Sequence, residues 1–278
     1  MSRGRPKSTI DPGDALESIR SGGAIDVYPQ STLSAIGKLM GLSGVSGLSK
    51  DKLIGKIQVA LIAEDPDSDH PIPELTYLVL DTETTLIGTG ATPARLLQLG
   101  YQIWRIDRNG DPYLVLEYES LVKPSGFTVS GTDIHGITED MANTGRDVGI
   151  VLEQFNNDMN EFDVDILVAH NFPFDWNVIS GEFNLLDIEN LPILDRKRIL
   201  SFDTCRTSPV LTYVQVKADL KRASFPTLSL LYEILFNRRM ETAHRALDDV
   251  KMTSDCLFEL LRLGVLDLTY AKQVIMRQ

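Results

Sequence analysis

The pattern of apolar and polar positions divides the chain from Leu75 onward into alternating strands and helices. Five short segments rich in apolar and aromatic residues are predicted to be strands, over residues 75–81, 94–107, 113–124, 165–171 and 198–204. Apolar residues three or four positions apart predict helices over residues 148–162, 172–186, 227–237 and 244–264. Strands interspersed with helices indicate an α/β domain, in which helices flank the sheet.

The residues before Leu75 have a different pattern. Leu33, Ile36, Leu39 and Met40 have helical spacing, and the glycine that follows predicts the end of a first helix. Ser49 is a candidate cap for a second helix, whose predicted apolar face is formed by Leu53, Ile54, Ile57 and Leu61. The predicted divisions are a basic flexible tail, a small helical domain, a Pro-rich acidic linker, the α/β domain and a C-terminal tail, over residues 1–30, 31–63, 64–74, 75–264 and 265–278.

Charge is unevenly distributed along the chain. Residues 1–63 carry 8 Lys/Arg and 5 Asp/Glu, a net charge of +3, whereas the whole chain has a net charge of −12. An acidic body repels phosphates unless divalent cations neutralise the relevant carboxylates. No apolar run approaches the roughly 20 residues of a membrane span, and the first residues have no signal-peptide core. These features predict a cytoplasmic protein with no membrane partner.

Two carboxylates occur at the predicted end of the first strand. Asp81 and Glu83 are two positions apart, so their side chains point to the same face of the strand. Paired carboxylates at the end of a hydrophobic strand are costly unless a cation lies between them, and Mg²⁺ or Mn²⁺ prefers such oxygen ligands. The alternative at this stage is an ordinary polar exit from a strand.

A second acidic position follows the predicted strand at residues 165–171. Asp175 lies in the first turn of the next helix, at the border of its apolar stripe. A carboxylate at a helix N-terminus is also stabilised by the helix dipole, so Asp175 alone does not establish a site. His170, at the strand end, is interpreted as a structural residue and is left out of the catalytic set.

The stretch "HRALDDVKMT" contains two adjacent aspartates, which helical geometry distinguishes. A helix advances about 100° per residue, and Ala246, Val250 and Leu257 lie on its apolar face. Asp248 lies about 170° from the centre of that face, among charged residues, whereas Asp249 lies only about 70° away. Asp249 is therefore the candidate ligand, and Asp248 is expected to face solvent.

Three stretches in this order resemble the motifs of the DEDDh branch of the 3′→5′ exonuclease superfamily. The stretches are "DTETT", "HNFPFD" and "HRALDD", with "IHGIT" between the first two. This branch includes the proofreading epsilon subunit of bacterial DNA polymerase III, exonuclease X, RNase T and oligoribonuclease. The resemblance covers residues 75–264 and implies an RNase H-like fold, in which helices flank a mixed sheet.

The resemblance also implies a site for two divalent ions, Mg²⁺ or Mn²⁺, held by Asp81, Glu83, Asp175 and Asp249. His244 would be the general base that takes a proton from the attacking water, and a nucleoside 5′-monophosphate would leave from the 3′ end. Substrate contacts are implied for Thr84, His135 and Asn171. A structural role for His135, bonding its own loop, is an equal alternative.

Resemblances at the N-terminus favour DNA over RNA as the substrate. Residues 31–63 resemble SAP and related helix-extended-helix modules, and "RGRPK" resembles an AT-hook core whose DNA-binding residues would be Arg3, Arg5 and Lys7. Docking on a protein partner is the alternative for the helical segment, and a weakly binding disordered tail is the alternative for the hook. The rival functions are an RNA exonuclease of the RNase T or oligoribonuclease kind, a polymerase-associated proofreading subunit and a catalytically silent binding module.

Overall fold

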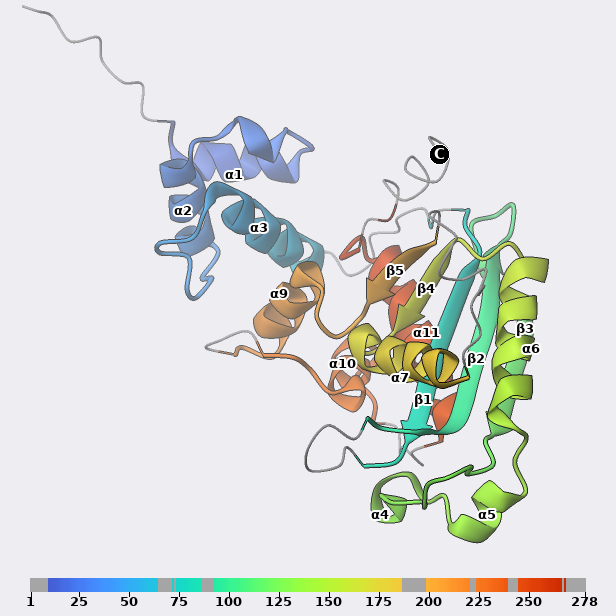
Figure 1. The fold of residues 1–278 in the computed structure, drawn as a ribbon. Helices are drawn as coiled ribbons and strands as arrows, with labels where there is room; N and C mark the ends of the chain where they lie inside the picture. The colour runs from blue at the N-terminus through green and yellow to red at the C-terminus, as the bar shows by residue number, and fades with distance from the viewer. Residues whose placement is uncertain are drawn as a thin grey trace, which may run out of the picture. The chain divides into compact units, whose positions relative to one another are not determined.

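The computed structural model describes residues 10–64, 72, 74–86, 93–186, 199–220, 224–239, 245–266 and 268. The chain divides into two compact units (Figure 1). The sheet unit comprises residues 69–207 and 225–278, and the helical unit comprises residues 1–68 and 208–224. Among the described residues, no helix has the length and apolar character that crossing a membrane requires.

A five-stranded mixed sheet forms the centre of the sheet unit, with strand order β3-β2-β1-β4-β5. The strands are β1 Tyr77–Thr84, β2 Leu96–Ile106, β3 Pro112–Leu121, β4 Ile166–Ala169 and β5 Leu200–Asp203. β1 to β3 are antiparallel neighbours, whereas β1, β4 and β5 run parallel. The ends of β1, β4 and β5 therefore meet at one side of the sheet, which we call the carboxyl edge. All five predicted strands are present, and the α/β class is confirmed.

Helices cover both faces of the sheet (Figure 1). α6 Val148–Glu161 and α7 Phe172–Leu185 pack on one face and α11 Ala246–Arg262 on the other, while α10 Leu228–Phe236 packs against α11. Alternate residues of β1 serve the two layers. Leu78 and Leu80 are fully buried in a cluster that contains Phe155 of α6 and Ile179 of α7. The neighbouring Tyr77 contacts α11 through an edge-to-face ring contact with Phe258 at 5.6 Å. The strand is apolar on both faces for this reason.

Two short helices between β3 and α6 were not predicted. They are α4 Thr132–His135 and α5 Glu139–Asn143. α4 is flanked by Gly131 and Gly136, which both have a left-handed backbone, and α5 is capped by the Thr138 hydroxyl. Helices of four or five residues are too short to show a hydrophobic period.

The helical unit has its own core. Its elements are α1 Pro12–Arg20, the 3₁₀ helix Ile25–Val27, α2 Gln30–Leu39, α3 Lys50–Glu64 and α9 Ser208–Lys217. Leu16 of α1, Leu33 and Ile36 of α2, and Leu53 and Ile57 of α3 form one buried cluster. The predicted domain of residues 31–63 therefore shares its core with residues that precede it.

α1 corrects the prediction of a flexible tail over residues 1–30. Asp11 caps this helix, because its side chain accepts hydrogen bonds from the backbone N–H groups of Gly13 and Asp14. Pro12 occupies the first helical position, where its missing N–H costs nothing. The apolar stripe Ala15, Leu16 and Ile19 is buried. Residues 1–9 lie outside the described residues.

The structure also differs from two further predictions about the helical unit. Leu39, assigned to the apolar face of α2, is 60% exposed, because it lies about 120° around the helix from Leu33. α9 was not predicted and lies within residues 75–264, yet it packs on α3, where the Lys56 ammonium donates to Gln215 Oε1 at 3.2 Å. The predicted α/β domain is therefore interrupted by a segment that belongs to the helical unit.

Part of the predicted C-terminal tail is folded. Val265, Leu266 and Leu268 are buried, and the Leu266 N–H donates to the Leu260 carbonyl at 3.1 Å. The left-handed Gly264 ends α11 and turns the chain so that these side chains reach the core.

Candidate functional site at the carboxyl edge

The end of β1 presents two carboxylates to one face of the sheet. Asp81 and Glu83 are half-buried, and the buried Thr82 between them points to the opposite face. Asp81 pairs with Gly100 of β2 and Glu83 pairs with Gln98, so all four residues face the α11 side. A bulge follows Glu83, so the ladder changes register at Thr84, which is half-buried.

Asp249 completes a group of three carboxylates. It lies in the first turn of α11, and its N–H donates to the Arg245 carbonyl at 3.1 Å. One carboxylate oxygen from each of Asp81, Glu83 and Asp249 lies within 4.8 Å of the others. Asp248 is not a member of this group. The structure thus brings together the three residues that strand and helix periodicity selected.

The three carboxylates repel one another in a poorly hydrated place. Burial raises the pKa of Asp81 well above its usual range, and the charges of Asp175, Asp249 and Glu83 raise it further. Burial also raises the pKa of Glu83 to about 7, with added effects from the charges of Asp249 and Asp175. A cation among the oxygens would relieve this repulsion, and an all-oxygen donor set suits Mg²⁺ or Mn²⁺. The residues present therefore fit a divalent metal.

Asp175 approaches β1 from the other layer. Its side chain is only 2% exposed, and its Oδ1 accepts from the Thr82 N–H at 3.0 Å and the Thr82 hydroxyl at 2.8 Å. Burial raises the pKa of Asp175 to about 7, although the hydrogen bonds from Thr82 act to lower it. The charge of Asp203 adds to the rise. Asp175 is thus anchored to the strand that carries Asp81 and Glu83, outside the group of three.

Docking of α11 on β2 sets the position of Asp249. The Ala246 N–H donates to Gln98 Oε1 at 3.2 Å, and the Leu247 N–H donates to Glu119 Oε1 at 3.4 Å. The sheet thus supplies the cap that Arg245 does not. A Cβ on Gly100 would lie 2.9 Å from the backbone of Ala246 and Leu247, so only glycine permits this approach. An isolated glycine within the strand sequence "LLQLGYQI" was the available signal, and it was missed.

A buried ion pair holds the exit of β1 from the α7 side. Arg95 donates two hydrogen bonds to the Glu182 carboxylate, at 2.7 and 3.0 Å, and Glu182 is 2% exposed. The Arg95 N–H also donates to the Thr85 hydroxyl at 2.9 Å, and its guanidinium lies over the Phe127 ring. The segment directly after Glu83 is therefore fixed from two sides. No local sequence signal pairs residues 87 positions apart.

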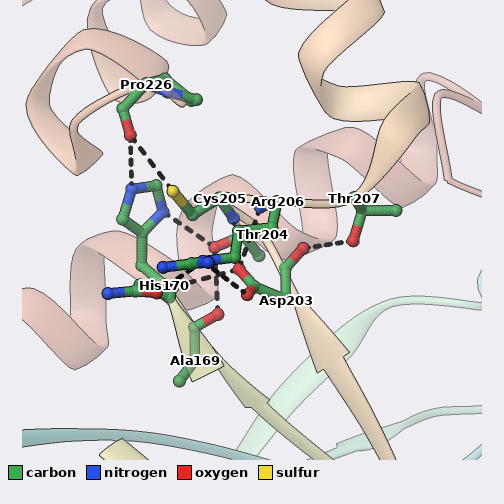
Figure 2. Close-up of polar contacts among 9 residues, drawn as sticks. Ala169, His170, Asp203, Thr204, Cys205, Arg206, Thr207 and Pro226 are labelled. Carbon is green, nitrogen blue, oxygen red and sulfur yellow. Dashed lines mark hydrogen bonds and ion pairs between the residues drawn. The ribbon is translucent and has the colours of Figure 1, made fainter. Parts of the chain in front are cut away.

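The ends of β4 and β5 are joined by a polar network (Figure 2). Asn171 has a left-handed backbone with φ of 80°, and its N–H donates to Asp203 Oδ1 at 3.1 Å. The same oxygen accepts from the N–H groups of Cys205 and Arg206. Asn171 Oδ1 in turn accepts from Arg206 Nε at 2.7 Å. The asparagine predicted as a substrate contact is therefore held rigidly at the carboxyl edge.

His170 belongs to this network and is not a member of the group formed by Asp81, Glu83 and Asp249. Its Nε2 must donate to the Pro226 carbonyl at 3.0 Å, which leaves Nδ1 to accept from the Thr204 hydroxyl at 3.0 Å (Figure 2). Burial lowers the pKa of His170, although the Pro226 bond and the Asp203 charge oppose this shift. A neutral structural histidine agrees with its exclusion from the predicted catalytic set.

His135 is 4% exposed, and both of its ring nitrogens are bonded within its own loop. Nδ1 accepts from the Ile137 N–H at 3.0 Å, and Nε2 donates to the Ser130 carbonyl at 3.0 Å. These contacts are the ones expected if His135 has a structural role in its own loop. Four other predicted site residues, His244, Arg3, Arg5 and Lys7, lie outside the described residues.

The RNase_T family, described as Exonuclease, matches residues 78–257. This range begins in β1, ends in α11 and includes all four acidic residues of the site.

Curated proteins similar to this chain are much longer. The PolC-type DNA polymerase III of Oceanobacillus iheyensis is 27% identical over 70% of this chain and 12% of the relative. The same protein of Listeria innocua is 24% identical over 92% of this chain and 16% of the relative. A DNA polymerase III subunit epsilon-like protein of Rhodobacter capsulatus is 30% identical over 70% of this chain and 25% of the relative. The chain thus spans at most a quarter of the length of these relatives.

Solved structures of nucleases share the fold. E. coli exonuclease I in complex with a dA16 oligonucleotide aligns with a TM-score of 0.51 and 16% identity, over 73% of this chain and 43% of that chain. The nuclease domain of 3′hExo, a DEDDh family member bound to rAMP, aligns with a TM-score of 0.50 and 14% identity, over 69% and 94%. At these identities the likeness is one of fold, and it confirms the predicted RNase H-like architecture.

Proposed function

Because the chain belongs to the Exonuclease family, we propose that it is a metal-dependent 3′→5′ exonuclease that releases nucleoside 5′-monophosphates from DNA. One observation carries the proposal: the carboxylates of Asp81, Glu83 and Asp249 converge within 4.8 Å at the end of a central strand. Bound cations would relieve their mutual repulsion, and cations are what a phosphodiester substrate requires near an acidic surface.

Each acidic residue has a distinct part in the proposed mechanism. Asp81 would bind both ions, while Glu83 and Asp249 would complete the site that activates the attacking water. Asp175, anchored through one oxygen to Thr82, would serve the second ion through a water. When bound, such ions activate a water and stabilise charge on the phosphate oxygens.

His244 would take the proton from the attacking water. In the sequence it directly precedes Arg245, whose carbonyl accepts the Asp249 N–H. A histidine that is neutral near pH 7 is suited to this transfer. Any shift in the docking of α11 would move Asp249 relative to Asp81 and Glu83.

DNA is favoured over RNA because the similar curated proteins are named as DNA polymerase III proteins. RNA is the alternative, since the structural neighbours include a nuclease domain bound to rAMP. The same polymerase names support a second candidate, in which the chain proofreads for a polymerase. Copurification with a polymerase subunit would distinguish this role from a free-standing nuclease.

The deciding experiment uses 5′-labelled single-stranded and double-stranded DNA and matched RNA, with Mg²⁺, Mn²⁺ or EDTA. We expect a 3′-shortening ladder on DNA that requires metal and yields 5′-monophosphates. A ladder on RNA alone would transfer the proposal to RNA. The absence of metal-stimulated hydrolysis on every substrate would favour the silent binding module.

A further inference from the structure

An exposed arginine and an exposed aromatic ring lie together at the carboxyl edge, apart from the carboxylates. Arg206 follows β5, and its guanidinium carbon lies 5.0 Å from the centre of the Phe225 ring. The Arg206 side chain is 47% exposed and Phe225 is 59% exposed. We call these two residues the Arg–Phe pair. It offers a fixed positive charge beside a π-surface, both open to solvent.

Contacts with neighbouring strands orient the guanidinium of Arg206. Its Nε donates to Asn171 Oδ1 at 2.7 Å and lies 4.0 Å from Asp203 Oδ2 (Figure 2). Among the described residues, nothing accepts a hydrogen bond from its two terminal nitrogens. The Nε side of the guanidinium therefore positions Arg206, and the two terminal nitrogens remain available to bind an anion.

Contacts with the backbone hold Phe225 in place. The carbonyl of the adjacent Pro226 accepts from His170 Nε2 at 3.0 Å and from Cys205 Sγ at 3.5 Å (Figure 2). Pro226 is itself buried. The segment that carries the ring is thus tied to residues directly after β4 and β5. Such preorganisation lowers the entropy that a binding event would cost.

The location of the pair relates it to the carboxylates. β1, β4 and β5 are adjacent parallel strands, so the end of β5, which Arg206 follows, lies two strand spacings, about 10 Å, from the end of β1. Asn171, after β4, lies between them in the strand order. A strand that reaches from the carboxylates to Arg206 must therefore extend beyond its terminal nucleotide.

We propose that Arg206 and Phe225 bind the single strand on the 5′ side of the scissile phosphate. The Arg206 fork would contact a phosphate, and a base would stack on Phe225, the combination that single-strand binding sites use. The assignment rests on the proposed nuclease function, which it extends with a second contact region. It predicts dependence on substrate length, because the terminal nucleotide alone cannot reach the pair.

The test compares two substrates in the full-length protein. One is a 5′-labelled single-stranded octanucleotide, and the other is the nitrophenyl ester of thymidine 5′-monophosphate, which has no nucleotide on its 5′ side. We expect Arg206→Ala and Phe225→Ala each to lower the ratio of kcat/KM for the octanucleotide to kcat/KM for the ester by about tenfold. A ratio that stays at the wild-type value would overturn the assignment.

Binding measurements separate the two contacts. Octanucleotide affinity is measured in Ca²⁺ at several salt concentrations. Arg206→Ala should lower the affinity and reduce the slope of log K against log salt by about 0.7, the value for one phosphate of a single strand. Phe225→Ala should lower the affinity and keep the slope. Arg206→Lys keeps the charge but loses the fork, so we expect it to restore the slope and only part of the affinity.

Matched controls lie at the opposite end of the sheet. Arg108 is exposed in the turn between β2 and β3, and Tyr113 of β3 is 47% exposed. Arg108→Ala and Tyr113→Ala should leave both the ratio and the affinity within about twofold of wild type. Equal losses in the controls would show a non-specific charge effect and refute the assignment. If wild-type protein hydrolyses neither substrate, the proposed function fails, whereas the affinities in Ca²⁺ still test the Arg–Phe pair.

Discussion

The sheet unit and the helical unit differ in what positions their main structural features. In the sheet unit the clustered carboxylates extend from a strand and a helix whose own periodicity sets their direction, as for Asp81 and Asp249. In the helical unit, α3 packs against α9, and Lys56 of α3 contacts Gln215 of α9, 159 residues later in the chain. The carboxylate cluster therefore depends on the local geometry of a strand and a helix and on the docking of α11 on the sheet. The helical unit depends on α9, a segment distant in sequence.

The largest effect is expected where local geometry selects one of two adjacent aspartates. Asp249→Asn removes one charge from the three carboxylates that we propose bind metal, so kcat/KM with Mg²⁺ should fall about 10³-fold. Asp248→Asn is the matched control and should stay within about twofold of wild type. Rates are measured on 5′-labelled single-stranded DNA, with thermal melting to verify folding. Equal losses in both variants would show that the register of α11 differs from the one described.

A second prediction concerns the docking of α11. Gly100→Ala places a methyl group 2.9 Å from the backbone of Ala246 and Leu247, so the helix must shift. A displacement near 1 Å costs about 10²-fold in rate, and overpacking costs about 1–3 kcal/mol of stability. Gly181→Ala in α7 meets no atom within 4 Å and is the control. Wild-type kcat/KM in the Gly100 variant would show that activity does not depend on the close approach of α11 to β2.

The third prediction tests whether the two units unfold separately. Ile57 is fully buried in the helical unit, so Ile57→Ala should destabilise that unit by about 2–5 kcal/mol. Both tryptophans, Trp104 and Trp176, lie in the sheet unit. We therefore expect the far-UV circular dichroism transition to move while the tryptophan fluorescence transition stays in place. Leu39→Ala, at a 60% exposed position, should move neither. Transitions that shift together would refute independent unfolding.

The smallest effect is a pH dependence of the metal-free protein. The pKa of Glu83 is about 7 in the folded protein and near 4.5 when unfolded. The folded state therefore binds more protons between these values, so stability falls as pH rises from about 4.5 to 7 and then levels off. We expect melting temperatures in EDTA to follow this trend, and Mg²⁺ to reduce it. Glu83→Gln should reduce the slope of the EDTA profile, and a smaller slope should remain because the pKa values of Asp81 and Asp175 are also raised. A slope equal to that of wild type would contradict the raised pKa of Glu83.

Much of the site could be predicted because its residues lie at regular positions. The period of a strand places Asp81 and Glu83 on one face, and the turn of a helix separates Asp249 from Asp248. The apolar runs of β1 and β4 show buried strands for the same reason. The prediction of a flexible tail over residues 1–30 was wrong for α1, although the cap Asp11 and the following Pro12 were visible signals.

The sequence by itself determined the five strands, the four helices packed around the sheet, the α/β class and the clustered acidic residues, because hydrophobic period and strand-end position are local properties. Only the tertiary structure decided which elements meet: α9 with α3, Arg95 with Glu182, and Arg206 with Asn171 and Phe225. It also showed that Gly100 admits α11 to the sheet and thereby sets Asp249 beside Asp81. These contacts join residues distant in sequence, and their energy depends on packing that no local pattern encodes.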